Sequence, residues 1–170
     1  MSDRSFPRNH TRHWPSSPRV ERRRARLAHH SAFWLRRLWA APISAVGLTL
    51  ALWARASGGG VRRVDGVLEI HGGGPGRVLP HLAPGGMIEA ITLGHVVWAI
   101  TPESHDRLRS HEREHVRQCE RWGPLFPLLY FSASALAWVR GRDPYRDNPF
   151  EQAAFAAERG VAAPRRRRGD

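Results

Sequence analysis

Residues 38–54 form an uncharged, largely apolar stretch with arginines on both sides, and this stretch most restricts how the chain can fold. Seventeen residues of helix reach about 26 Å, the short end of a membrane span. Trp39 and Trp53 stand near the two ends, where interfacial tryptophans are common. We therefore expect a transmembrane anchor helix at residues 38–56. The alternative is a buried helix of a soluble domain.

The net charge of +12 is concentrated at the two ends of the chain. Residues 1–37 carry +8 and residues 165–170 carry +3, which leaves +1 for the part between them. The positive-inside rule therefore places the N-terminus on the cytoplasmic side of the membrane. A nearly neutral body without a recognisable nucleic-acid module argues against nucleic acid as a partner. An arginine tail that binds nucleic acid or anionic lipid stays open as an alternative function.

Composition divides the chain into four parts. The polar, proline-containing residues 1–37 show no sustained apolar period and are expected to form a disordered, arginine-rich tail. The anchor at 38–56 is followed by a folded domain at 57–164 and a basic tail at 165–170. A single cysteine excludes a disulfide scaffold and a zinc site made only of thiolates.

The pattern of the folded domain predicts short strands followed by helices, an α+β arrangement. Thr101 is expected to cap a helix that has Pro102 at its first position and ends before Gly123. The predicted elements are a strand at 64–71, two short strands or one bulged strand at 87–93 and 95–100, and helices at 101–122 and 150–162.

The first of these helices carries an HExxH motif, formed by His111, Glu112 and His115. Residues four apart project from the same side of a helix, so the two imidazoles can reach one metal ion. Glu112 stands beside them, where it can act as a general base on a water molecule. The motif lies in the middle of the helix face expected to be buried, and burying such polar groups requires partners. A metal would satisfy them, whereas an exposed polar helix is the alternative.

A site with two histidines and a water usually needs a third protein ligand. Glu151, at the start of the last helix, is the best candidate, although an ordinary first-turn acid is equally compatible with that position. The other candidates are His71, His81, His95 and His105. His105 is discounted because it lies six residues before His111, on the wrong side of the helix, and His95 is expected to be a structural or second-shell group. A His-His-Glu set suits Zn²⁺ without excluding other transition metals.

The HExxH helix, the later Glu-x-x-Ala helix and the strands before them together resemble the gluzincin zinc metallopeptidases in their smallest form. The segments TLGHVVWA, HEREHVRQCERWGPLFPLLYFSASALAW and GRDPYRDNPFE resemble a family of small bacterial membrane-associated proteins of unassigned function. The resemblance implies a compact α+β, zincin-like domain at the bacterial inner membrane. It implies His111, His115 and Glu151 as zinc ligands and Glu112 as the base, and Tyr145 is a candidate second-shell or oxyanion-stabilising group.

The function expected from these residues is that of a membrane-anchored zinc protein with a metallopeptidase-like site, acting on a peptide or protein substrate. Active peptidases of this type usually have uncharged residues inside the motif, whereas Arg113 and Glu114 are both charged here. A catalytically inactive metal-binding or structural membrane protein is therefore the alternative.

A second uncharged stretch at residues 122–139 constrains the metal site. If it spanned the bilayer, His115 and Glu151 would lie on opposite faces, about 25 Å or more apart, and could not share an ion. Its early prolines and its length of 18 residues favour a buried or surface-lying helix instead. Both possibilities are open from the sequence.

Overall fold

A computed structural model describes residues 18–82 and 88–162 of the chain. Of the tails predicted at 1–37 and 165–170, residues 1–17 and all of 165–170 lie outside the described residues. The chain divides into two units after Phe33, and the unit that begins at Trp34 contains the sheet.

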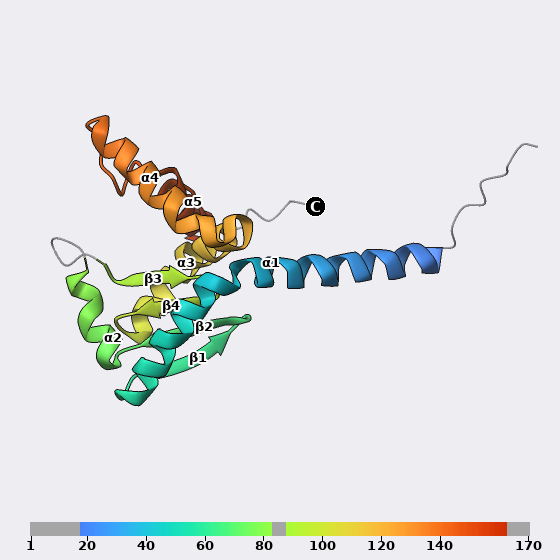
Figure 1. The fold of residues 1–170 in the computed structure, drawn as a ribbon, viewed down its shortest axis with the longest axis horizontal. Helices are drawn as coiled ribbons and strands as arrows, with labels where there is room; N and C mark the ends of the chain where they lie inside the picture. The colour runs from blue at the N-terminus through green and yellow to red at the C-terminus, as the bar shows by residue number, and fades with distance from the viewer. Residues whose placement is uncertain (1–17, 83–87, 163–170) are drawn as a thin grey trace, which may run out of the picture. The chain divides into compact units, whose positions relative to one another are not determined.

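The unit is α+β, as predicted, with a small mixed four-stranded sheet and helices on both of its faces (Figure 1). The helices are α1 (Pro18–Ala56), α2 (Gly73–Val78), η1 (Leu79–His81), α3 (Pro102–Trp122), η2 (Gly123–Leu125), α4 (Phe126–Val139) and α5 (Pro149–Ala162). The strands are β1 (Gly60–Val64), β2 (Val67–His71), β3 (Ala90–Leu93) and β4 (Val96–Ala99).

The strand order in the sheet is β1-β2-β4-β3. β1 and β2 are antiparallel, β2 and β4 are parallel, and β3 and β4 are antiparallel. The segment expected as one strand at 64–71 is instead the second half of a hairpin, because Asp65 and Gly66 both have positive φ angles (47° and 79°) and turn the chain back. For 87–93 and 95–100 the sequence left open two short strands or one bulged strand, and over the described residues the structure has two strands, β3 and β4.

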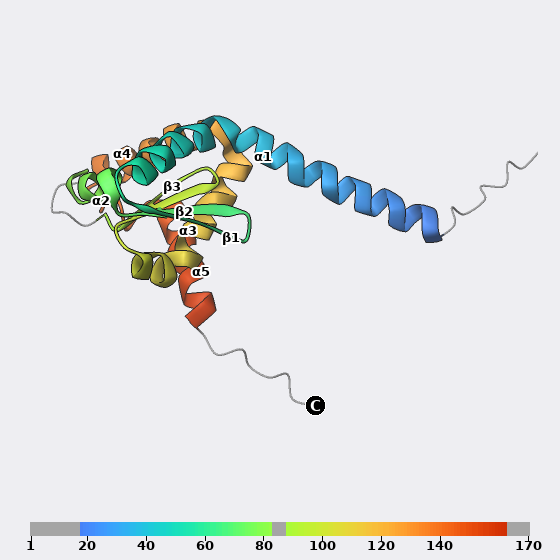
Figure 2. The ribbon, with the colours of Figure 1, turned by 90° about the horizontal axis from the view of Figure 1, so that it is seen from below.

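The C-terminal half of α1 covers one face of the sheet, and α3 covers the other (Figure 2). Ala51 of α1 packs with Ile70, Val96 and Trp98. The approach is close: a Cβ added at Gly47 would come within 2.6 Å of the Val96 side chain. The segment expected as a separate anchor at 38–56 is therefore a layer of the same folded unit.

On the opposite face, Val116 of α3 packs against Val67 and Val97. Successive side chains of a strand point to opposite faces, so each strand divides its residues between the two helices. α5 packs beside α3 on this side of the sheet. Both HExxH and Glu151 therefore lie on the α3 side of the sheet.

Among residues 18–82 and 88–162, two helical segments are long and apolar enough to span a membrane, residues 33–56 and the continuous helical run 102–139. α1 begins at Pro18, well before the start of the expected anchor, so residues 18–37 of the predicted tail are helical. α4 contains no charged residue, and it leads into a loop that returns the chain to α5.

Candidate metal centre

α3 carries the HExxH motif and begins as the sequence predicts. The Thr101 side chain accepts a hydrogen bond from the Ser104 N–H, and Pro102 occupies the first turn. The helix ends at Trp122, where Gly123 has a φ of 54°. The middle of the predicted buried face is buried, with His111 4%, Glu112 6% and His115 7% exposed.

The structure brings His111, His115 and Glu151 together. The Nε2 atoms of the two histidines are 3.2 Å apart. Glu151 Oε2 lies 3.2 Å from Nε2 of His111, and Oε1 lies 3.3 Å from Nε2 of His115. Glu151 is itself only 3% exposed. This group of three can hold a metal ion, with one ligand atom from each residue and all of these atoms within 4.8 Å of one another.

An unsatisfied carboxylate oxygen in this group fits a bound cation. Glu151 Oε2 is buried without a hydrogen-bond partner, whereas the unpartnered Nδ1 of His111 lies on the other side of the ring, 3.8 Å from Glu158. The separations of 3.2 and 3.3 Å match the roughly 3.3 Å between neighbouring ligands of tetrahedral zinc with bonds of about 2.0–2.1 Å. Two imidazole Nε2 atoms that face each other across 3.2 Å need a cation or a proton between them. The residues present therefore suit a divalent metal such as zinc.

Gln118, one turn after the motif, orients His115. Its Nε2 donates to the Phe150 carbonyl over 3.0 Å, which directs Oε1 toward His115. Oε1 lies 2.9 Å from His115 Nδ1, so the proton of the neutral imidazole belongs on Nδ1. The Nε2 lone pair is then free to point at the centre of the group, as in metal sites where the second ring nitrogen is hydrogen-bonded.

Tyr130 of α4 reaches the same centre. Its hydroxyl donates to Oε1 of Glu151 over 2.6 Å. Although burial raises the pKa of Glu151, the nearby imidazoles of His111 and His115 and the hydrogen bond from Tyr130 outweigh it and hold that pKa well below its usual range. Glu151 is therefore a carboxylate, the form that a metal requires.

Glu112 is buried on the sheet side of α3. Thr92 of β3 donates a hydrogen bond to Oε2 of Glu112 over 2.6 Å. Burial raises the pKa of Glu112, against the opposing effects of His115 and of the Thr92 hydrogen bond. A carboxyl with a raised pKa, next to two imidazoles, is a better proton acceptor than an ordinary carboxylate and can also return the proton.

Tyr145 lies close to the group, whereas His95 does not. Burial and the charge of Glu151, with which its hydroxyl interacts, raise the pKa of Tyr145. Tyr145 is 48% exposed, so it lies between the centre and solvent. His95 instead faces Glu120, with Nε2 3.0 Å from the carboxylate, and its backbone N–H donates to Ser44 of α1. It holds the β3–β4 turn against the helices.

The two charged residues inside the motif point away from the metal centre. Arg113 donates to the Val64 carbonyl over 2.6 Å and lies near Glu69, on the β1–β2 hairpin. Glu114 forms an ion pair with Arg117 at the surface of α3. Neither side chain occupies the space between the imidazoles, so the unusual motif interior does not obstruct the site.

A groove of about 380 Å³ lies between α3 and α5, beside the metal centre. None of the three ligand residues lines it. Gln118 and Phe150 line the groove and also contact each other behind His115. Its lining residues are Glu114, Arg117, Gln118, Arg121, Trp122, Pro149, Phe150 and Ala153.

Sequence reasoning missed Thr92, Gln118 and Tyr130. Tyr130 and Ser134 are four residues apart on an otherwise apolar helix, and this spacing was a usable signal for a polar contact on one face. Gln118 follows the motif by three residues, so it shares a face with His115. Thr92 offered no signal, because its contact with Glu112 depends on how the sheet packs on α3.

Comparison with known proteins does not assign the chain to a group: no family model, curated protein or solved structure matches it.

Proposed function

We propose that this chain is a zinc protein with a zincin-like hydrolytic site, in which His111, His115 and Glu151 hold the ion and Glu112 is the general base. The observation that supports it most directly is the buried convergence of three side chains that can ligate a metal, with Oε2 of Glu151 left without a hydrogen-bond partner. Burying such an atom costs about 1–3 kcal/mol unless something binds it.

The residues around the ligands supply orientation and proton transfer. When bound, zinc acts as a Lewis acid and lowers the pKa of water. Glu112 accepts the proton of the attacking water and later delivers it to the leaving amine. Gln118 and Tyr130 fix the orientation of His115 and Glu151, and we assign the Tyr145 hydroxyl, which interacts with Glu151, the role of donor to a developing oxyanion.

The sheet edge supports a peptide as the substrate. β3 is an edge strand, and its Thr92 contacts the proposed base directly. An extended peptide can add to such an edge through backbone hydrogen bonds, which would bring a peptide bond toward Glu112. The zincin-like assignment rests on this combination of an edge strand, an HExxH helix and a ligand from a later helix.

A metal site without catalysis is the second candidate function. It is favoured by the closure of the site, because each of the three ligands is 7% exposed or less and none lines the groove between α3 and α5. In that case the metal would join α3 to α5 and stabilise the fold.

The test is metal analysis and peptide hydrolysis with the full-length chain in detergent, because α1 covers the sheet and belongs to the folded unit. We expect about one zinc per chain in the wild type and in Glu112→Gln, and loss of zinc in His111→Ala and Glu151→Ala. His81→Ala, at an exposed histidine outside the group, is the matched control.

The Glu112→Gln variant distinguishes the hydrolase from the structural metal site. Loss of hydrolysis with zinc retained supports the hydrolase. Zinc retained in the wild type without hydrolysis of a peptide library supports the structural site. A folded wild type that binds no zinc contradicts both.

The chain is further proposed to reside at a bacterial plasma membrane with its N-terminus on the cytoplasmic side. The support is the apolarity of α1 and α4 and the excess of arginine in residues 1–37.

A further inference from the structure

The C-terminal half of α1 places its large apolar side chains outward. The residues that pack on the sheet and on α3 are mostly small, namely Ala40, Ile43, Gly47, Ala51 and Ala54. The opposite face exposes Leu38 (72%), Trp39 (47%), Val46 (56%), Leu52 (73%) and Trp53 (44%). A helix at the surface of a water-soluble protein shows the reverse arrangement, with polar side chains outward.

α4 repeats this arrangement. Phe126 and Ala137 are buried, and Tyr130 faces the metal centre. The other side exposes large apolar residues without a charge among them, Leu128 (65%), Phe131 (68%), Leu136 (48%), Trp138 (71%) and Val139 (76%).

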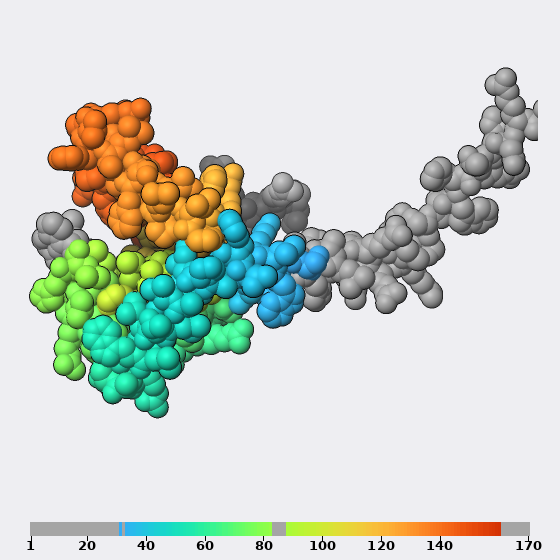
Figure 3. Space-filling model, in the orientation of Figure 1, coloured from blue at the N-terminus to red at the C-terminus, as the bar shows by residue number. Residues whose placement is uncertain are grey.

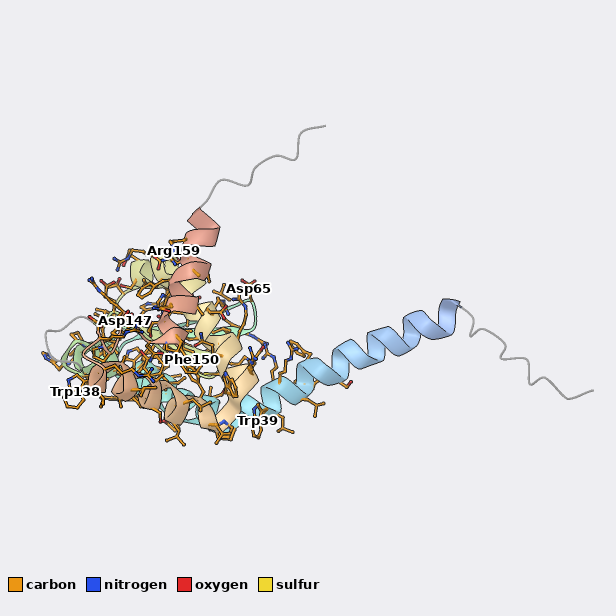
Figure 4. The ribbon with its side chains drawn as sticks, turned by 90° about the horizontal axis from the view of Figure 1, so that it is seen from above. Trp39, Asp65, Trp138, Asp147, Phe150 and Arg159 are labelled. Carbon is orange, nitrogen blue, oxygen red and sulfur yellow. The ribbon has the colours of Figure 1, made fainter. Side chains whose placement is uncertain are left out.

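The two exposed surfaces lie on one side of the unit. Ile43 of α1 and Phe126 of α4 belong to the same buried cluster, so the helices meet at that point. α1 and α4 both face the viewer in Figure 3. In Figure 4, Trp39 and Trp138 lie along the lower edge of the unit, whereas Asp65 and Arg159 lie on the opposite side. We call the exposed side chains of residues 38–53 and 128–139 the apolar face.

The borders of the apolar face fit a bilayer surface. Exposed arginines flank the two apolar stretches, with Arg36 and Arg55 in α1 on either side of residues 38–53 and with Arg140 and Arg142 after α4. Trp39, Trp53 and Trp138 lie near the ends of the two apolar stretches. Tryptophan prefers the boundary between headgroups and hydrocarbon, and arginine pairs with anionic headgroups. This charge pattern complements an anionic lipid surface.

The contacts of α4 are incompatible with its crossing the bilayer. Its 14 residues reach about 21 Å, less than the hydrocarbon thickness of about 30 Å. Asn148 donates to the Tyr130 carbonyl and to Ser134, so the chain returns alongside α4 within a few residues. End-on insertion would carry Arg140 and Arg142 into the hydrocarbon, which is costly for charged side chains.

α1 is likewise held against one face of the sheet. Crossing the membrane would separate Ala51 from Ile70 and Trp98, or would take the strands into lipid with it. A helix that lies flat keeps these contacts and still removes its outer face from water.

We propose that the chain docks on an anionic lipid bilayer through the apolar face, with α1 and α4 lying in the plane of one leaflet and neither crossing it. This proposal deepens the proposed membrane association and is independent of the metal site. It places the metal centre and the α3–α5 side of the sheet above the same leaflet.

The test measures depth with a fluorophore on single cysteines in full-length protein carrying Cys119→Ser. Outward positions Leu52→Cys and Phe131→Cys are compared with Asp65→Cys and Arg159→Cys on the far side. The protein is reconstituted in vesicles of phosphatidylcholine mixed with phosphatidylglycerol, and lipids brominated at different acyl depths report the position of each label.

We expect quenching of both outward labels by shallow bromines and none at the far-side positions. Maximal quenching from bromines at the bilayer centre, or labels reached from both sides of the vesicle, would show a crossing helix and overturn the proposal. Outward labels that no bromine quenches, in a protein that forms dimers, would assign the face to a second copy instead.

Charge substitutions provide a second measurement. Leu52→Glu and Leu128→Glu should each lower vesicle affinity about tenfold or more, because each removes one leucine from the inserted surface. Ala156→Glu adds the same charge to an exposed position of α5 and should leave affinity unchanged. If all three variants bind vesicles with the affinity of the wild type and also keep its zinc content, the docking proposal is contradicted and the proposed metal site is not.

Discussion

The Tyr130 hydroxyl donates a 2.6 Å hydrogen bond to Oε1 of Glu151, and this bond joins the apolar helix α4 to the metal centre. α4 would otherwise resemble a membrane helix with no part in the chemistry. Because Tyr130 holds a ligand in place, movement of α4 and the geometry of the centre are coupled.

Tyr130→Phe should weaken zinc binding about tenfold or more, because it removes the hydroxyl that donates a hydrogen bond to Glu151. Competition with a chromophoric chelator measures the affinity. Tyr145→Phe is the matched control: it is half exposed, and a smaller loss is expected there. Equal affinity in Tyr130→Phe and the wild type would mean that Tyr130 does not position the ligand.

Thr92→Val should destabilise the fold by about 1–3 kcal/mol, because it keeps the shape of the side chain and leaves the buried Glu112 carboxyl without its donor. Urea unfolding measures the change. Thr49→Val, at an exposed threonine of α1, should change stability by no more than a few tenths of a kcal/mol. If the two variants behave alike, the Thr92–Glu112 contact is not made in solution.

Gly47→Ala tests whether α1 is a layer of the fold. An added Cβ would meet Val96 at 2.6 Å, so we expect a loss of about 1–3 kcal/mol. Gly160→Ala in α5 meets no atom within 4 Å and should stabilise by up to about 1 kcal/mol. A stabilising Gly47→Ala, measured by the same urea unfolding, would indicate a helix separate from the sheet.

The ionised Glu69 carboxylate should stabilise the fold at neutral pH, so the free energy of unfolding should fall in acid. Although burial raises its pKa, hydrogen bonds from Arg109 and Arg62 lower that pKa below the ordinary 4.5. A carboxyl with a lowered folded pKa contributes stability that is present above the unfolded pKa and is lost as the pH falls through the folded value.

Glu69→Gln should therefore cost about 1–3 kcal/mol near neutral pH and less as the pH falls below 4.5, since the two arginines remain partly exposed. Urea midpoints across the acidic range measure both slopes. A constant difference between variant and wild type at every pH would exclude ionised Glu69 as the cause.

Local patterns predicted the elements that depend on neighbouring residues. Thr101 and Pro102 begin α3, and Gly123 ends it, because caps and breakers act within one helical turn. The Asp-Gly pair at residues 65 and 66 is also a local signal for a hairpin turn, and the prediction of a single strand at 64–71 did not use it.

Other relationships lay beyond any local pattern. Hydropathy marks residues 38–54 as apolar, but a protein core and a lipid bilayer both accept apolar side chains, so it cannot say which of them α1 faces. The packing shows that the small residues of α1 face the sheet and the large ones face outward, as with Ala51 against the sheet and Leu52 exposed.

The amino-acid order alone placed His111, Glu112 and His115 on one side of a helix, because a helical period of 3.6 residues brings i and i+4 together. Bringing Glu151 to those imidazoles required α5 to pack on α3, and bringing Thr92 to Glu112 required the sheet. Such contacts join residues distant in the chain, and they depend on how complementary surfaces pack, which no short spacing records.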